Sequence, residues 1–328
     1  MIPDLSDLPA PDLSALAAIN ARIDDILRPP GALERLDEVA SWIATWHGTP
    51  TPLVHRPHAV IFAADHGVVA EGVSAFPSEV TGAMLAAFEA SKASVSALAR
   101  VAGAEVTAID VGVAKPSGNI RHEPALDEER FGEAFARGRE AVRELDTDLL
   151  IFGEMGIGNT TPAAAVSAAI VGGESDHFVG RGTGVDDDAR NIKRQVVADA
   201  LSRLESDSEP MEVLRQVGGT ELVAIAGGMV EARMRSIPVL LDGYIATSPA
   251  LALHAIDPDL VANCRAGHCS AEPGHQRVLD HLGLSPLLTL DMRLGEASGA
   301  MAAVPLIKMA CALVNEVPTF TEWFGSDG

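Results

Sequence analysis

The sequence predicts an α/β protein, built on a mostly parallel sheet with helices on both faces. Short apolar runs alternate along the chain with longer segments of helical periodicity, and glycine-rich loops follow several of the apolar runs. The composition agrees with this fold class. Of the 328 residues, 47% are hydrophobic and only 4% are aromatic, which suits a core packed with small side chains.

The alternation begins after a helical and proline-rich N-terminal part. Helices are expected over residues 12–27 and 32–46, separated by Pro29-Pro30-Gly31, and the Pro- and Thr-rich residues 49–58 are expected to form a linker at a domain edge. Strands are then expected over 59–64, 105–111, 148–152, 238–241, 287–290 and, more weakly, 259–263. Helices are expected over 79–102, 127–144, 163–171, 210–217, 221–235, 244–256 and 300–314. One further helix is expected to begin at residue 186 and another to end at residue 281.

Charge and cysteine content exclude several function classes. The net charge of −22 opposes general binding to nucleic acid or to anionic membranes. Three cysteines without a C-x-x-C spacing disfavour a disulfide framework, so we expect a cytoplasmic protein. The acidic, proline-broken N-terminus does not resemble a signal peptide, and no uninterrupted apolar run is long enough to span a bilayer. Neither G-x-S-x-G nor G-x-x-x-x-G-K-[ST] occurs.

The stretch 287–300, LLTLDMRLGEASGA, holds a candidate catalytic carboxylate. An apolar run passes through a glycine loop into a long apolar helix, and Glu296 lies directly before that helix. Ligands of α/β proteins gather at the carboxyl ends of strands, so Glu296 is a candidate base in a small-molecule pocket. The alternative is a first-turn carboxylate that only satisfies free helix amides.

A second glycine-rich segment, residues 153–158, follows an expected strand and precedes a helix start at Thr161-Pro162. Its backbone and the first helix amides suit a phosphate or carboxylate, and Glu154 suits a ribose hydroxyl or a cationic ring. The alternative is a tight turn with a good helix cap. The spacing is not G-x-G-x-x-G, so it gives little support for a dinucleotide.

The remaining polar motifs have ordinary structural explanations. Asp186, Asp187 and Asp188 fit a helix N-terminus better than a metal site. Asp65-His66 is either an acid–base dyad or, more commonly, structural, and His268 with Cys264 and Cys269 lacks the second ligand pair of a zinc site. No metal is therefore expected.

Taken together, the ordered motifs are far more specific than any one of them. They are Pro29-Pro30-Gly31-Ala32-Leu33, the segment from ADHGV at 64 to SEVT at 78, GEMGIGNTTPAAA at 153, VGRGTG at 179, PVLLDG at 238, GHCSAEPG at 267 and MRLGEASGA at 292. In this order they resemble the nicotinate-nucleotide–dimethylbenzimidazole phosphoribosyltransferase family of cobalamin lower-ligand synthesis. The resemblance extends from about Pro29 to Asn315.

The resemblance implies a reaction and an architecture. Nicotinate mononucleotide would give its ribose 5-phosphate to 5,6-dimethylbenzimidazole, releasing nicotinate and forming α-ribazole 5′-phosphate, without a cofactor. It also implies a homodimer, a large Rossmann-like catalytic domain (51–305) and a small helical domain from both chain ends (1–50 with 306–328).

The resemblance also implies roles for particular residues. Glu296 would be the catalytic base and Glu154 the second active-site glutamate. The nucleotide would lie against loops that contain Gly156, Asn159, Thr160, Gly182, Lys193, Ser270 and Gly295, although a surface salt bridge is the alternative for Lys193. The base would contact Phe76, Met84, Met155 and Leu294.

The acceptor pocket departs from the family pattern. Phe76 and Met84 stand where other members carry a small hydroxyl residue and a glutamine, so another benzimidazole, a purine or a phenol is an alternative acceptor. A non-catalytic nucleotide-binding protein and a heteromeric subunit that activates phenols remain further alternatives.

Overall fold

The sheet confirms the predicted fold class. The computed structural model describes residues 2, 4–182 and 184–325 of the chain. Within them five parallel strands form one sheet in the order β2-β1-β3-β4-β5. The strands are β1 (Pro57–His66), β2 (Glu105–Ser117), β3 (Leu149–Met155), β4 (Val239–Leu241) and β5 (Cys264–Ala266).

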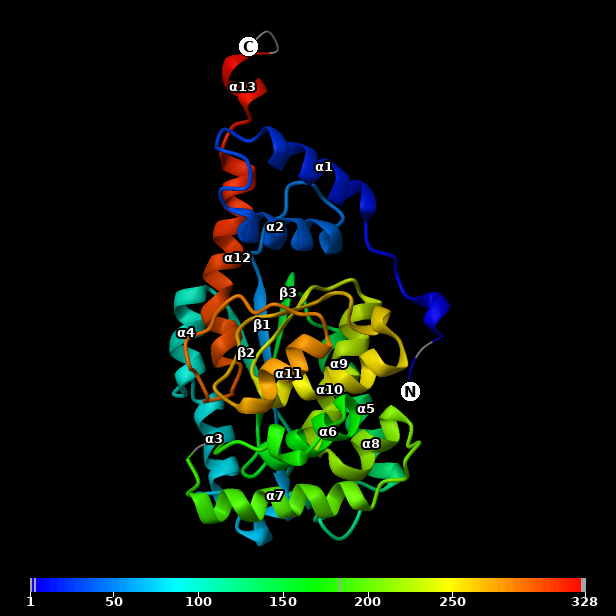
Figure 1. Cartoon of the computed structure of the whole chain (residues 1–328). Coiled ribbons are helices and arrows are strands. Elements are labelled where there is room, and N and C mark those ends of the chain that lie inside the picture. Colours follow the sequence, from blue (N-terminus) through cyan, green and yellow to red (C-terminus); the bar gives the residue numbers. More distant parts are fainter. Residues whose placement is uncertain (1, 3, 183, 326–328) are drawn as a thin grey trace.

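Helices cover both faces of the sheet because alternate strand residues are apolar on both sides, as expected for a buried parallel sheet (Figure 1). Phe62 and Phe152 face one core, and Ile61 and Ile151 face the other. The first core is shared with α5 (Glu128–Arg143), α6 (Thr160–Val171), α7 (Asp187–Ser202), α8 (Pro210–Val217), α9 (Thr220–Met234), α10 (Tyr244–Ile256) and α11 (Pro273–His281). The second core is shared with α2 (Glu34–His47), α3 (Glu79–Glu89), α4 (Ser94–Ala102) and α12 (Ser298–Glu316).

The strand order creates a switch point between β1 and β3. From β1 the chain passes to β2 at one edge, and β3, β4 and β5 then build the sheet in the opposite direction. Connections therefore diverge at the carboxyl ends of β1 and β3 and leave a crevice there, which is where ligands bind in open α/β sheets.

The N- and C-terminal α-helices gather at the opposite end of the molecule, whereas the first described residues of the chain lie at the level of the sheet (Figure 1). Helices α1 (Leu13–Asp25) and α2, the end of α12 and α13 (Phe320–Phe324) lie together there (Figure 1). Arg22 links them, since its guanidinium donates to the carbonyl of Val314 at 2.7 Å and to the carboxylate of Glu322 at 2.8 Å. Residues of α2 belong to the same hydrophobic core as the sheet, and the division into 1–50 with 306–328 and 51–305 stays a prediction.

Helix α12 alone among the described helices is long and apolar enough, by length and composition, to cross a membrane. It is the helix expected over 300–314, and Lys308 interrupts its apolar sequence. More than half of its most apolar window (56%) is buried inside this molecule. That burial is typical of a core helix.

Three predicted elements were wrong. Residues 287–290 are not a strand: Leu288 makes one isolated bridge to His268, and Leu290 is 61% exposed. The strand expected over 259–263 is also absent. Residues 258–261 form a short 3₁₀ helix instead, because Asp257 caps the amide of Asp259, and the strand follows as β5.

The helix expected over 79–102 is two helices. Ser91 has a left-handed backbone (φ 55°), and the amide of Lys92 bonds to the carbonyl of Ala87 at 2.8 Å, which closes α3 before α4 begins. The segment expected as a loop over 153–158 also starts later, because Gly153, Glu154 and Met155 still belong to β3. Helix α6 then begins at Thr160 with Asn159 as its N-cap residue, one turn earlier than predicted.

Candidate active site

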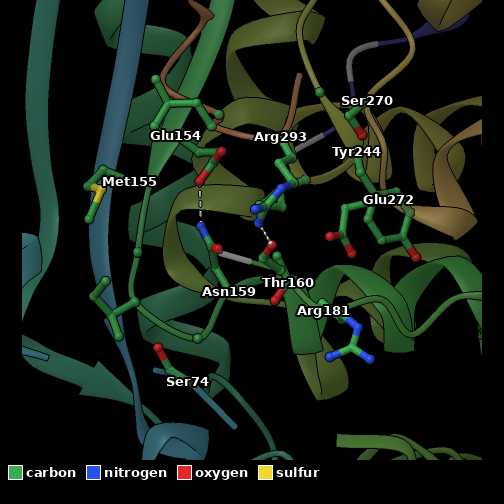
Figure 2. Close-up of a pocket in the computed structure, with 18 of the residues that line it drawn as sticks. Ser74, Glu154, Met155, Asn159, Thr160, Arg181, Tyr244, Ser270, Glu272 and Arg293 are labelled. Atoms are coloured by element: carbon green, nitrogen blue, oxygen red, sulfur yellow. Dashed lines mark hydrogen bonds between the residues drawn. The ribbon is translucent and has the colours of Figure 1, made fainter. Parts of the chain in front are cut away.

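A pocket of about 770 Å³, counted to its open mouth, lies in the crevice at the carboxyl ends of the strands. The turn between β3 and α6, the start of α10 and the segments around 181–185, 268–272 and 293–295 line it. In Figure 2 Glu154 and Met155 stand on one side, and Tyr244, Ser270 and Glu272 stand on the other. All the residues that the resemblance assigned to the nucleotide line this one pocket: Gly156, Asn159, Thr160, Gly182, Lys193, Ser270 and Gly295.

Glu154 is held in place at the end of β3. It is 5% exposed, and the side-chain amide of Asn159 donates a short hydrogen bond to its Oε2 (Figure 2). Gly295 packs against the other carboxylate oxygen so closely that a Cβ there would overlap Oε1. Burial, opposed by the Asn159 hydrogen bond and reinforced by nearby carboxylates, raises the pKa of Glu154 to about 8.

Glu296 lies in a strained turn directly before α12. Both Glu296 (φ 60°) and Ala297 (φ 64°) have left-handed backbones, and the amide of Ala297 packs against Gly153 of β3. Its side chain is buried, and its Oε2 has no hydrogen-bond partner in the described part of the chain. Burial, with a smaller contribution from the charge of Asp242, raises the pKa of Glu296 to about 7.

This geometry disfavours the interpretation of Glu296 as a helix-capping carboxylate, since no backbone amide of the described residues donates to its Oε2 and Ala297 is the N-cap residue of α12. A buried carboxylate that is half-ionised near neutral pH and has a free oxygen is equipped to accept a proton.

The other end of the pocket suits an anion. Lys193 is 1% exposed, and its ammonium donates to the hydroxyl of Thr160 at 2.8 Å and to the carbonyl of Gly180 at 3.4 Å. The surface salt bridge considered for Lys193 is therefore wrong. Burial lowers its pKa to about 8, while Glu272 opposes this shift. Gly182 lies beside both groups, and Thr160 begins α6, so a lysine and a helix N-terminus meet at one point.

Several pocket residues were not predicted. Arg181, Arg293, Tyr244, Glu272 and His268 line the pocket. Arg293 donates to the carbonyl of Gly182 at 3.0 Å and thereby ties the segment before Glu296 to the anion end. The signal for these residues was available in part, because VGRGTG, GHCSAEPG and MRLGEASGA were already singled out as motifs.

Asp242 was also missed. It is fully buried at the carboxyl end of β4, and it accepts the amide of Ala300 in the first turn of α12 at 2.8 Å. Burial raises its pKa, although His268, whose Nε2 lies 3.6 Å from its Oδ1, opposes the shift. A carboxylate that directly follows a strand in an α/β sheet is a signal that sequence reasoning can use.

The residues assigned to the base fall into two groups. Met155 and Leu294 line the pocket, whereas Phe76 and Met84 do not line it. Phe76 is 47% exposed on the loop after Ser74, and Met84 packs partly buried on α3. Val73 and Ser74 of the same loop line the pocket, so this loop is the part of the chain that links Phe76 to the site.

The discounted motifs have structural partners. His66 pairs with Glu221 rather than with Asp65, whose Oδ2 accepts the amide of Ala114 at 2.8 Å. Asp186 caps α7. The three cysteines are buried and free, and no group of three metal-ligating side chains occurs among the described residues.

Thr183, inside VGRGTG, lies outside the described residues, as do residues 326–328 of the expected small domain.

The fold and the pocket are those of an α/β protein whose site suits an anionic small molecule and lies near two buried glutamates. The family model described as "Phosphoribosyltransferase" matches residues 8–323 of the chain. With the relatives described next, this match places the chain in the nicotinate-nucleotide–dimethylbenzimidazole phosphoribosyltransferase family and confirms the resemblance seen in the sequence. It is an enzyme of the pentosyltransferase class.

The relatives are similar over nearly their full length. Nicotinate-nucleotide–dimethylbenzimidazole phosphoribosyltransferases from Cereibacter sphaeroides (strain ATCC 17025) and Mesorhizobium japonicum are each 46% identical to the chain, cover 96% of it, and are themselves covered over 93% and 94% of their lengths. A crystal structure of CobT from Thermus thermophilus superposes with a TM-score of 0.92 at 42% identity, covering 96% of this chain and 100% of that one.

Proposed function

We propose that this enzyme transfers ribose 5-phosphate from nicotinate mononucleotide to 5,6-dimethylbenzimidazole, with Glu296 as general base, in the assembly of the cobalamin lower ligand. The observation that carries the proposal is the Glu296 carboxyl group. It is buried beside the pocket, its Oε2 is free of partners among the described residues, and its pKa is raised to about 7. The nucleotide phosphate would lie at Lys193 and the start of α6, and the base between Met155 and Leu294.

The chemistry follows from these positions. Glu296 takes the N–H proton of the benzimidazole while a ring nitrogen forms a bond to C1′ of the ribose. The bond between C1′ and nicotinate breaks, and its electron pair neutralises the pyridinium ring, so the leaving group needs no acid. Attack from the face opposite nicotinate inverts C1′ and gives the α-linked product. Fixing both ligands in one pocket supplies much of the acceleration.

The lining of the pocket bears on the choice of acceptor. Apolar side chains, Val73, Met155, Ile157 and Leu294, form part of the pocket lining, and Ser74 also lines it. Apolar walls accept several flat bases, so another benzimidazole, a purine or a phenol is the second candidate. A heteromeric subunit that activates phenols is the variant that requires a second, similar chain.

The test mixes the purified enzyme with nicotinate mononucleotide and dimethylbenzimidazole and follows nicotinate release, with mass and NMR identification of the riboside phosphate. We expect release with an α-linked product. Met155→Ala and Leu294→Ala should raise KM for the base more than Phe76→Ala and Met84→Ala do, because only the first pair lines the pocket. Binding of the nucleotide without release for any acceptor would contradict the proposal and favour a non-catalytic binding protein.

We also propose a cytoplasmic homodimer, as the family resemblance implies. Sedimentation at several protein concentrations tests whether the protein is a dimer, since a particle of 34.2 kDa would indicate a monomer.

A further inference from the structure

A buried histidine–glutamate pair lies behind the β3–α6 turn that lines the pocket, outside the proposed mechanism. His66 is the last residue of β1, and Glu221 lies in the first turn of α9. Both side chains have 0% exposure, and His66 Nε2 and Glu221 Oε1 form a hydrogen bond of 2.8 Å. His66 Nδ1 and Glu221 Oε2 have no partner in the described part of the chain. Burying polar atoms without hydrogen-bond partners costs free energy, which suggests that the pair has a functional role.

Two glycines hold this pair on opposite sides. A Cβ on Gly156 would lie 2.9 Å from His66 Nε2 and 2.8 Å from the carbonyl of Ala64. A Cβ on Gly219 would overlap His66 Cε1 and approach Glu221 Oε2 to 3.0 Å. The imidazole ring therefore packs directly on the backbone of the β3–α6 turn and on the backbone that starts α9.

The first of these backbones belongs to the pocket. Gly156 follows Met155, and the same turn continues to Asn159, which holds Glu154, and to Thr160, which accepts from Lys193. All of these residues line the pocket. The His66 ring therefore packs against the side of this turn that faces away from the pocket, and the hydrogen bond to Glu221 fixes the position of the ring.

We infer that His66 and Glu221 form a positioning pair that sets the 156–160 turn and thereby the binding of the nucleotide. The inference rests on the proposed function. The pair does not touch the reacting atoms. The turn that it sets carries Gly156, Asn159 and Thr160, which the proposed function assigns to the nucleotide, so its loss should act on the nucleotide more than on the base.

The same two elements supply matched controls. His58 lies on β1 at the opposite end of the strand, with 9% side-chain exposure, and its Nε2 bonds to the hydroxyl of Thr107 at 2.8 Å. Glu231 lies on α9, with 8% side-chain exposure, and pairs with Arg139 at 2.8 Å. His58→Ala and Glu231→Gln therefore remove a similar buried contact from β1 and α9 without touching the pocket.

The experiment measures KM for each substrate, kcat, the Kd for nicotinate mononucleotide by calorimetry, and the melting temperature. For His66→Ala we expect KM and Kd for the nucleotide to rise ~10-fold, with KM for the base changed less than ~2-fold. His66→Gln should stay within about 3-fold of the wild type, because the Gln amide nitrogen occupies the place of Nε2, whereas His66→Asn should resemble His66→Ala. Glu221→Ala should reproduce His66→Ala, and the controls His58→Ala and Glu231→Gln should lower only the melting temperature.

Unchanged nucleotide KM and Kd in His66→Ala, with a loss of melting temperature like that of His58→Ala, would overturn the inference. Equal losses for both substrates would do the same. If His66→Ala fails to fold, the contrast between His66→Gln and His66→Asn decides. If the wild type binds the nucleotide but never releases nicotinate, the proposed function fails, and the Kd values still decide whether the pair positions the nucleotide.

Discussion

Glu154 lines the pocket and Glu296 directly follows Gly295, which also lines it, yet the surroundings of the two carboxyl groups differ. Glu154 ends a strand, accepts from Asn159 and is confined by Gly295. Glu296 follows a glycine in a left-handed turn, and its Oε2 has no partner among the described residues. Both pKa values are raised, to about 8 and about 7, and burial is the main cause for each.

The difference shows how one residue type serves two purposes. A carboxyl group that is hydrogen-bonded and packed on both sides is fixed, so we expect Glu154 to shape the pocket and to position a ligand. A carboxyl group with a free oxygen can accept a proton without breaking an existing bond, so Glu296 is the better base. The predictions below separate the two glutamates.

The largest expected effect is the loss of the base. Glu296→Gln should lower kcat by ~10²–10⁴-fold and leave Kd for nicotinate mononucleotide within about 2-fold, because the amide fills the same space and accepts no proton. Steady-state nicotinate release and calorimetry measure the two quantities. Full activity in this variant would remove Glu296 from the mechanism, and a larger loss in Glu154→Gln would exchange the two roles.

The next effect comes from the glycine between them. In Gly295→Ala the new methyl group meets Glu154 Oε1, and the backbone has φ 81°, so we expect kcat/KM to fall ~10²-fold. Gly283→Ala is the matched control: its φ is 66° and nothing lies within 4 Å of the added Cβ. It should lose about 1 kcal/mol of stability and keep its activity. Equal activity in the two variants would show that the packing of Glu154 is irrelevant to turnover.

The pH profile tests the free carboxylate of Glu296. A base is active when deprotonated, so kcat/KM should fall about tenfold per pH unit as the pH drops below about 7. The residual activity of Glu296→Gln provides the control, because any titration of the substrates persists in it. An acid limb near the ordinary glutamate value, or one that survives in Glu296→Gln, would contradict the assignment.

The smallest effect concerns stability. The folded protein holds a proton on Glu154 up to about pH 8, whereas an unfolded glutamate loses it near 4.5, so this group lowers stability progressively as the pH rises between those values. Glu154→Gln removes that loss. Its free energy of unfolding should gain about 1–3 kcal/mol on the wild type between pH 5 and pH 9, measured by urea unfolding. A constant difference across this range would show that Glu154 titrates normally.

The regular elements were largely predictable from sequence. Periodicity found α8 and α10 with their observed bounds, Pro210–Val217 and Tyr244–Ile256, because local apolar spacing decides such helices. It failed at 79–102 and 287–290. The first segment breaks at a left-handed serine that no composition signal marks, and the second is apolar because it packs beside His268 and the second core rather than in the sheet.

The site was predictable only where motifs carried it. The glycine loops led to both glutamates and the family resemblance led to Asn159 and Lys193, whereas Asp242 and the His66–Glu221 pair depend on contacts between residues 58 to 155 positions apart. Such contacts follow from strand order, which a single sequence does not reveal. The pairing of His66 with Glu221 rather than with its neighbour Asp65 illustrates this directly.

Helix α12 connects the pocket end of the molecule with the terminal helices. Its 19 residues span about 28 Å, from the turn that holds Glu296 to the carbonyl of Val314, which accepts from Arg22 of α1. The amide of Ala300 donates a hydrogen bond to Asp242, so the end of α12 next to Glu296 is anchored. With Ala300 as the pivot, a tilt of about 2° displaces the far end of α12 by about 0.8 Å and the turn that holds Glu296, about one helical turn from the pivot, by only about 0.2 Å. We therefore expect the hydrogen bond between Ala300 and Asp242 to protect the position of Glu296 from small movements of the outer helices.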